Sequence, residues 1–184
     1  MRSEIIRRVL VGLAGVLTVA ASISCDNGAK ALAWDDVDRL IQEDFPGVPS
    51  VTTAELVDAL ADGRDIVLLD VREEAEFAVS HLLGAQRVTS AGGASDILEN
   101  SGPDPLVVAY CAVGYRSAAL VKELRERGIA NAVNLEGSIF AWANAGLPVY
   151  RGVLEVDEVH PFDDTWGTLL DRGLWAFEPI REIP

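Results

Sequence analysis

The chain has 184 residues, 49% of them hydrophobic, which is enough for one domain with a real core plus terminal segments. Its formal net charge is −14, and no lysine- or arginine-rich face is visible. Because so acidic a body repels phosphate backbones and anionic lipid surfaces, the composition argues against nucleic acid as a partner.

Residues 1–24 are predicted to be an export signal. A basic start is followed by 16 residues without a charge. As a helix these would span about 24 Å, less than the roughly 30 Å of a bilayer's hydrocarbon core, so cleavage is favoured over a spanning helix. Cys25 follows Ser24 as in a bacterial lipoprotein processing site, although Ser22 stands where that pattern prefers leucine. Cys25 is therefore the predicted lipidated first residue of the mature chain.

Two alternatives stay open for this start: cleavage after the Ala-Leu-Ala sequence at 31–33, and a short uncleaved anchor. All three place the body outside the cytoplasm, in the periplasm or another extracytoplasmic compartment, touching the membrane only through the signal or a lipid anchor. If Cys25 is acylated or removed, Cys111 is the remaining thiol of the two in the chain, and no internal disulfide forms. Exported proteins usually pair their cysteines or lack them, so a lone one requires an explanation.

Residues 25–50 are predicted to form a short helix and a linker. Val37, Leu40 and Ile41 have helical spacing within "WDDVDRLIQEDF", and the proline-containing stretch 46–50 follows as the linker.

Residues 51–150 alternate between helix and strand patterns. Strands are expected at 65–71, 85–90, 106–111 and 132–137, and helices at 52–63, 72–81, 94–100, 116–128 and 138–146. The strands "DIVLLDV" and "LVVAYC" are almost wholly apolar, as expected of strands buried on both faces. The pattern predicts an α/β domain with a parallel sheet of about five strands and helices on both faces.

Residues 151–184 break this alternation and are predicted to be a C-terminal extension. It contains two of the four tryptophans, Trp166 and Trp175, together with His160. Aromatic residues at this density predict a packed segment. The sequence assigns it no role.

The stretch "LVVAYCAVGYRS", residues 106–117, ends a buried strand on Cys111. Ligands of open parallel sheets bind beyond the carboxyl ends of the strands. Successive loop amides and the positive end of the following helix would stabilise a negative charge on the sulfur. Gly114 allows a tight loop, and Arg116 offers a permanently charged fork of donors for an oxyanion. These features favour a nucleophilic Cys111 over an inert buried cysteine.

The loop "CAVGYRS" resembles the active-site loop of single-domain rhodaneses, Cys-x-x-Gly-x-Arg-Ser. Residues 68–85 and 133–149 are similar to two further segments of that family, Asp-Val-Arg…Glu-Phe…His-Ile-Pro-Gly-Ala and Asn-Leu-Glu-Gly-Gly…Ala-Trp…Gly-Leu-Pro-Val. The resemblance covers about residues 51–150. Ser80 and Ser138 stand in place of glycines, and Leu82-Leu83 in place of Ile-Pro.

The resemblance implies a thiosulfate sulfurtransferase without metal or cofactor. Cys111 would attack the outer sulfur of a small anionic donor such as thiosulfate and become a persulfide. The substrate-binding residues would be Ala112, Val113, Gly114, Tyr115 and Arg116, with the guanidinium of Arg116 on the sulfonate end. Asp70 and Arg72 would brace the loop. Because no second cysteine is available, an external thiol, cyanide or a partner protein must accept the sulfur.

Other functions were weighed against this one. A phosphatase loop of the form Cys-x5-Arg would be one residue longer than the spacing from Cys111 to Arg116. A Cys–His hydrolase needs a histidine base, but His81 is interpreted as structural and His160 as a surface residue. Two scattered histidines predict no metal site. The remaining alternative is a rhodanese-like persulfide carrier, or a partner-binding or sensing module, without turnover.

Overall fold

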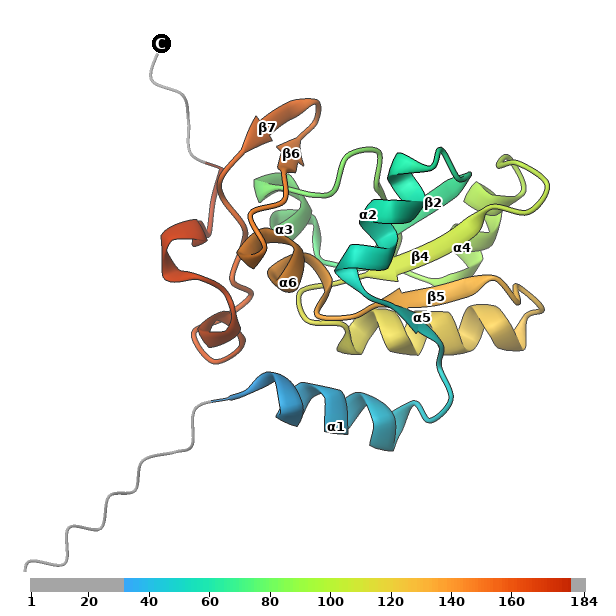
Figure 1. The fold of residues 1–184 in the computed structure, drawn as a ribbon, viewed down its shortest axis with the longest axis horizontal. Helices are drawn as coiled ribbons and strands as arrows, with labels where there is room; N and C mark the ends of the chain where they lie inside the picture. The colour runs from blue at the N-terminus through green and yellow to red at the C-terminus, as the bar shows by residue number, and fades with distance from the viewer. Residues whose placement is uncertain (1–31, 180–184) are drawn as a thin grey trace, which may run out of the picture.

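The computed structural model describes residues 32–179, which fold around a five-stranded sheet (Figure 1). Its strand order is β1-β5-β4-β2-β3, and every neighbouring pair is parallel. The strands are β1 (Ser50–Val51), β2 (Ile66–Asp70), β3 (Gln86–Arg87), β4 (Leu106–Tyr110) and β5 (Ala132–Leu135). The predicted α/β class and five-stranded parallel sheet are thus confirmed. Ser50, placed by the sequence in a linker, instead begins the edge strand β1.

Helices cover both faces of the sheet because neighbouring residues of β2 and β4 point to opposite sides. The helices are α1 (Trp34–Asp44), α2 (Thr53–Ala61), α3 (Glu74–Val79), α4 (Ala91–Leu98), α5 (Tyr115–Glu126) and α6 (Ser138–Asn144). Val67 and Val107 pack in one cluster with residues of α4 and α5, whereas Leu68 and Val108 pack in another with residues of α2 and α6. The nearly continuous apolar strands are therefore explained by burial on both sides.

The capping residue of α2 is Thr52. The Thr52 Oγ1 accepts a hydrogen bond from the Glu55 amide at 3.2 Å, and the Thr52 amide donates to the Glu55 carboxylate at 2.8 Å. This reciprocal pair satisfies two N–H groups at the helix start and fixes where α2 begins.

The C-terminal extension is packed, as its aromatic content predicted. The predicted boundary at residue 151 falls inside a hairpin of β6 (Val149–Arg151) and β7 (Leu154–Val156). The extension then forms two short 3-10 turns, η1 (Trp166–Leu169) and η2 (Arg172–Leu174). The Asn144 side chain of α6 donates to the Leu169 carbonyl at 2.8 Å and accepts from the Asp171 amide at 2.9 Å. These bonds hold the extension against α6 (Figure 1).

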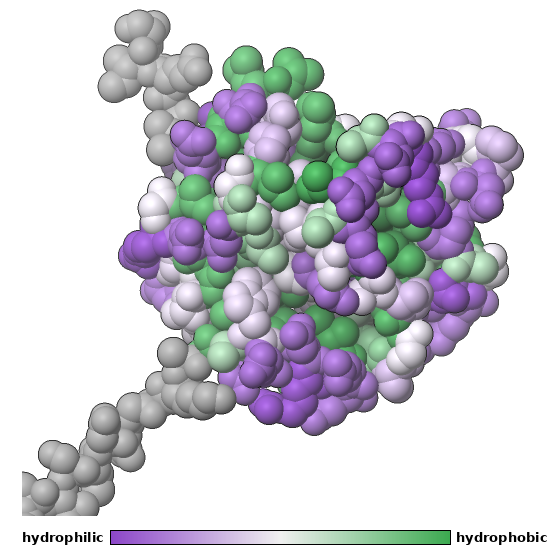
Figure 2. Space-filling view, in the orientation of Figure 1, coloured by the Kyte–Doolittle hydropathy of each residue, from purple (hydrophilic) through white to green (hydrophobic). Residues whose placement is uncertain are grey.

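Helix α1 lies beside α5 at the lower edge of the domain (Figure 1). Its Val37 is fully buried, while most of its other side chains face solvent. Figure 2 shows hydrophilic residues gathered over this helix. None of the helices within residues 32–179 is long and apolar enough to cross a membrane. The predicted export signal and Cys25 lie outside the described residues.

Candidate active site

The carboxyl ends of β2, β4 and β5 bring three sequence segments together. Asp70 at the end of β2 is paired in register with Tyr110 at the end of β4, and Ala109 is paired with Asn134 of β5. Cys111 follows β4 directly. The sheet therefore places Cys111 at the edge where ligands of parallel sheets bind.

The loop after β4 turns a backbone donor onto the cysteine sulfur. The Gly114 amide donates a hydrogen bond to the Cys111 Sγ at 3.1 Å. Gly114 has a φ of +107°, and a Cβ there would lie 3.3 Å from the Asn134 Nδ2 and 3.4 Å from the Ile41 Cδ1. Glycine is thus required for both its conformation and its close contacts. Helix α5 begins at the next residue, so Gly114 is the N-cap of the helix, whose first-turn N–H groups have no intrahelical acceptor.

The opposite side of the loop is held by the start of α6. The Ile139 amide donates to the Cys111 carbonyl at 3.2 Å, and the Phe140 amide donates to the Ala112 carbonyl at 3.1 Å. The Ser138 Oγ accepts from the Cys111 amide at 3.1 Å and donates to the Leu135 carbonyl at 3.1 Å. The carbonyl groups of Cys111 and Ala112 therefore both accept hydrogen bonds from the amides of α6.

This role of Ser138 was not predicted from the sequence. A serine stands there in place of the glycine of the rhodanese pattern. Ser138 has a φ of +50°, a region that favours glycine, and its two side-chain hydrogen bonds hold it there. Where the family pattern has a glycine, Ser138 therefore holds the loop of Cys111 in place through its side-chain hydroxyl.

Arg116 is paired with a buried carboxylate that the sequence analysis did not predict as a partner. Its Nη1 and Nη2 each donate to one carboxylate oxygen of Glu76 at 2.8 Å. The Glu76 side chain is 3% exposed and that of Arg116 31%. Burial alone lowers the pKa of Arg116, but the hydrogen bonds and charge of Glu76 and the electrostatic interaction with Cys111 outweigh it and leave that pKa raised. The Arg116 guanidinium is therefore charged and close to the sulfur.

Asp70 and Arg72 form a second ion pair that is fully buried. The Arg72 Nη2 lies 2.7 Å from the Asp70 Oδ2, and the same nitrogen donates to the Ser80 carbonyl at 2.6 Å. Burial lowers the pKa of Arg72, but the charge and hydrogen bonds of Asp70, together with Tyr110 and Glu76, outweigh it and leave that pKa raised. The pair links the end of β2 to the residues after α3, the helix that carries Glu76. The role expected for Asp70 and Arg72, bracing the loop after Cys111, stays a prediction.

The extension adds two aromatic side chains to the site, which the sequence analysis did not predict. Phe162 and Trp166 line a pocket of about 180 Å³ together with Cys111 and its loop neighbours Ala112, Val113, Tyr115 and Arg116. The Phe162 ring lies over the Arg116 guanidinium, 4.8 Å from ring centre to guanidinium carbon. The walls of this pocket are predominantly apolar. From the sequence, Trp166 was predicted only to be part of a packed C-terminal extension.

The two histidines have different environments. His81 has the expected structural contacts: its ring stacks on Phe77, its Nε2 accepts from the Gly152 amide at 3.2 Å, and its backbone pairs with Tyr150. His160 is half-buried, which corrects its interpretation as a surface residue. Burial, more than any neighbouring charge, lowers the pKa of His160. Within residues 32–179, no group of three or more histidine, cysteine or acidic side chains is placed to hold a metal ion.

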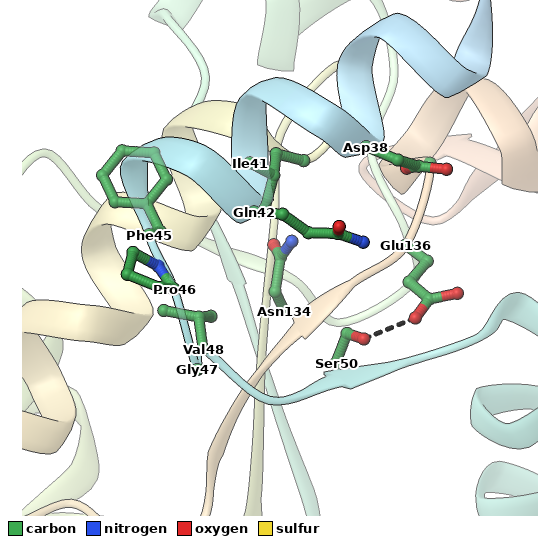
Figure 3. A pocket seen from close by; sticks show the side chains of 11 residues that line it. Asp38, Ile41, Gln42, Phe45, Pro46, Gly47, Val48, Ser50, Asn134 and Glu136 are labelled. Carbon is green, nitrogen blue, oxygen red and sulfur yellow. Dashed lines mark hydrogen bonds between the residues drawn. The ribbon is translucent and has the colours of Figure 1, made fainter.

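A larger hollow of about 370 Å³ lies between α1 and the ends of β1 and β5 (Figure 3). The side chains of Gln42 and Asn134 both line it, and the Ser50 hydroxyl donates a hydrogen bond to the Glu136 carboxylate (Figure 3). Burial, followed by the charges of Glu136 and Asp35, raises the pKa of Asp38 at its rim. None of its lining residues is a cysteine. The candidate nucleophile Cys111 therefore lines the smaller pocket and not this one.

Comparison with known proteins supports the sequence resemblance. The family described as rhodanese-like domain matches residues 52–145. The "Sulfurtransferase" of Allochromatium vinosum is 34% identical over 103 residues, covering 55% of this chain and 94% of that protein. The "Probable adenylyltransferase/sulfurtransferase MoeZ" of Mycobacterium tuberculosis is 36% identical over 100 residues, covering 54% of this chain and 26% of that protein. This chain thus matches about a quarter of the length of MoeZ.

A solved structure agrees with the fold. The thiosulfate sulfurtransferase of Pseudomonas aeruginosa superposes with a TM-score of 0.56 at 24% identity, covering 63% of this chain and 22% of that chain. At this identity the likeness concerns the fold alone. The match to residues 52–145 leaves Phe162 and Trp166 outside the family region.

Proposed function

Because the chain belongs to the rhodanese-like domain family, we propose that it is a sulfurtransferase that carries a sulfane sulfur as a persulfide on Cys111. The observation that supports this most is the hydrogen bond from the Gly114 amide to the Cys111 Sγ, 3.1 Å long, at the carboxyl end of β4. A hydrogen-bond donor directed at the sulfur stabilises the negative charge of the thiolate before the attack and that of the persulfide after it.

The first half-reaction transfers sulfur from the donor to the enzyme. The Cys111 thiolate attacks the outer sulfur of a donor such as thiosulfate, an S–S bond to Cys111 forms, and the donor's S–S bond breaks. The electron pair of that bond leaves with sulfite, and no proton is required. A separate general base is therefore unnecessary, in keeping with the structural contacts of His81.

The residues around Cys111 have distinct roles in this proposal. Backbone N–H groups of the loop 112–116 bind the anionic sulfur, and the cation of Arg116 lies beside it. Glu76 positions the Arg116 guanidinium. Asp70 and Arg72 position the end of β2 and the residues after α3.

The second half-reaction returns the thiolate. An external nucleophile attacks the outer sulfur of the persulfide and the Cys111 thiolate leaves. Cys111 is 1% exposed and reached through a small pocket, which favours a compact acceptor such as cyanide or a low-molecular-weight thiol over a folded protein. A partner protein would have to present an extended thiol.

Incubation with thiosulfate and cyanide, followed by a thiocyanate assay, tests this function. We expect many turnovers per chain. A protein that gains one sulfur from thiosulfate but yields no more than one thiocyanate per chain would instead be a carrier. No sulfur gain from thiosulfate or an organic thiosulfonate would contradict both roles.

We further propose that the chain is exported and that Cys25 is its lipidated first residue. The support is the charge-free stretch before Cys25 and the short reach of that stretch as a helix. Mass spectrometry of the mature N-terminus tests this. A diacylglyceryl-modified Cys25 is the expected result, and an N-terminus after Ala33 or an intact Met1 would contradict lipidation.

A further inference from the structure

Phe162 and Trp166 cover the sulfur pocket from outside the family region. The family match ends at residue 145, whereas both aromatic residues come from the C-terminal extension. Phe162 covers Arg116, and Trp166 lines the same pocket as Cys111. Any donor that reaches Cys111 must therefore fit beside these two rings.

The turn that carries the rings is tightly specified. The Asp163 carboxylate accepts from the amides of Thr165 and Trp166, both at 2.8 Å, and so fixes the start of η1. Phe162 has a φ of +67°, and the amide after it donates to the Pro161 carbonyl at 2.9 Å. A three-residue turn with positive φ is the rarer, strained kind, and a bulky aromatic residue seldom adopts it. This strain is retained where it holds the Phe162 ring over Arg116.

The charge of Arg116 is already matched by the protein. Both ends of its guanidinium are bound to Glu76, and its upper face is covered by the Phe162 ring. A dianion such as thiosulfate must give up water to enter this apolar pocket, and the matched Arg116 compensates only part of that loss. A donor with one negative charge and a hydrocarbon group loses less hydration and buries the group against the rings.

We propose that Phe162 and Trp166 select sulfane-sulfur donors that carry a hydrocarbon group, with aryl thiosulfonates preferred over methanethiosulfonate and thiosulfate. This inference rests on the proposed function of Cys111. The size of the pocket suits such a group: it has a volume of about 180 Å³, and an apolar cavity of about 150 Å³ accepts benzene.

The transfer from a thiosulfonate balances without another reactant. The Cys111 thiolate attacks the sulfane sulfur of R–SO2–S⁻ and forms an S–S bond with it. The bond between that sulfur and the sulfonyl sulfur breaks, and its electron pair leaves with the sulfinate R–SO2⁻. The negative charge of the sulfane sulfur stays on the persulfide, and no proton or external electron is exchanged.

The test compares kcat/KM of the full chain for benzenethiosulfonate, methanethiosulfonate and thiosulfate at saturating cyanide. Thiocyanate is the common product, so one assay serves all three donors. We expect benzenethiosulfonate to be preferred over methanethiosulfonate by at least about 10-fold, because even one methylene in an apolar pocket gives about 10-fold or more. Taking the ratio between donors removes differences in the fraction of active protein.

Phe162→Ala and Trp166→Ala should each reduce this preference by about 5-fold or more, because each removes apolar contact with the aryl group of the donor. Trp166→Phe should retain part of it. The matched control is Phe177→Ala, which removes an exposed aromatic ring of the same extension that does not line the pocket. Its preference should equal that of the unaltered chain.

Two results would overturn the selectivity while leaving the proposed function intact: equal use of the aryl and methyl donors by the unaltered chain, or a preference that survives both alanine substitutions. Absence of thiocyanate and of a sulfur mass gain with all three donors would overturn the proposed function and, with it, the selectivity.

Discussion

Two sides of the Cys111 pocket differ in origin and in physical character. We call the side that comes from the family region the floor, and the side formed by the rings of Phe162 and Trp166 the roof. The floor comes from the family region and is held by buried charges, with Arg72 1% exposed and Glu76 2% exposed. The roof comes from the extension and is made of aromatic rings, with Phe162 41% exposed. The floor is thus part of the folding core, whereas the roof covers the site from the surface.

Because of this difference, we expect substitutions in the two sides to have different effects on stability and on activity. Removing one member of a buried ion pair leaves an uncompensated charge, which lowers the stability of the whole domain. Removing a partly exposed ring deletes little buried contact. Chemistry and stability should therefore depend on the floor, and donor choice on the roof.

Cys111→Ser removes the chemistry without disturbing either side and has the largest expected effect. A serine Oγ can still accept from the Gly114 amide, so the loop should keep its form. Thiocyanate formation should fall by at least about 10³-fold, since a weak nucleophile replaces the thiolate. Cys25→Ser is the control and should retain the activity. Sulfur transfer by the Cys111→Ser chain at more than a trace level would remove this cysteine from the mechanism.

Arg72→Met tests the floor by leaving Asp70 buried without its partner. The free energy of unfolding, measured in urea, should fall by about 3–5 kcal/mol. Combining it with Asp70→Leu should recover part of the loss, because no lone charge then remains. For the roof, Phe162→Ala should cost less than about 1 kcal/mol. A cost for Phe162→Ala as large as that for Arg72→Met would break the distinction between floor and roof.

Ser138→Ala and Ser138→Gly separate the two effects of Ser138 in the floor. Both remove the acceptor of the buried Cys111 amide, which should cost about 1–3 kcal/mol in the free energy of unfolding. Glycine also relieves the positive φ, so Ser138→Gly should be more stable than Ser138→Ala by about 1 kcal/mol. Equal stability of the two variants would show that the backbone at 138 is not strained.

Glu76 should make the stability of the floor depend on acid. Burial raises the pKa of Glu76, but the hydrogen bonds and charge of Arg116, with help from the Glu73 amide and Arg72, bring it below its ordinary value of 4.5. A depressed folded-state pKa stabilises the fold above pH 4.5, and this stabilisation is lost as the pH falls through the folded-state value. Urea unfolding at a series of pH values from about 6 down to about 3 measures this loss of stability.

The matched variants for this titration are Glu76→Gln and Arg116→Met. Glutamine removes the titrating group, so the part of the acid dependence due to Glu76 should disappear. In Arg116→Met, the guanidinium no longer lowers the pKa of Glu76, so the rise in that pKa caused by burial is no longer outweighed. The contribution of Glu76 to the pH dependence of the free energy of unfolding should therefore weaken or change sign. The same acid dependence in all three chains would exclude Glu76 as its source.

The parts of the floor that follow from local sequence could be predicted. The apolar runs of β2 and β4 and the helical spacing of α5 placed Cys111 at a strand end, and the tight loop required a glycine at 114. The contacts Glu76–Arg116 and Ser138–Cys111 join residues 40 and 27 positions apart, so no local pattern indicates them. Two signals were available: the replacement of a glycine by Ser138, and the position of Glu76 in the Glu-Phe part of the family segment that residues 68–85 resemble.

The roof could not be predicted, for a physical reason. Residues 157–179 contain short 3-10 turns and a strained turn at Phe162 instead of a periodic element. Periodicity predicts helices and strands, but it does not predict where an aperiodic segment crosses a surface. The aromatic content therefore indicated packing against the domain without indicating the pocket of Cys111.

Peptide mapping and intact-mass measurement of the full chain after exposure to thiosulfate or benzenethiosulfonate test the persulfide on Cys111 most directly. The account predicts a gain of one sulfur atom on the peptide that contains Cys111, reversed by cyanide and missing in the Cys111→Ser chain. A chain that gains no sulfur from either donor, or gains it equally in the serine variant, would contradict the account.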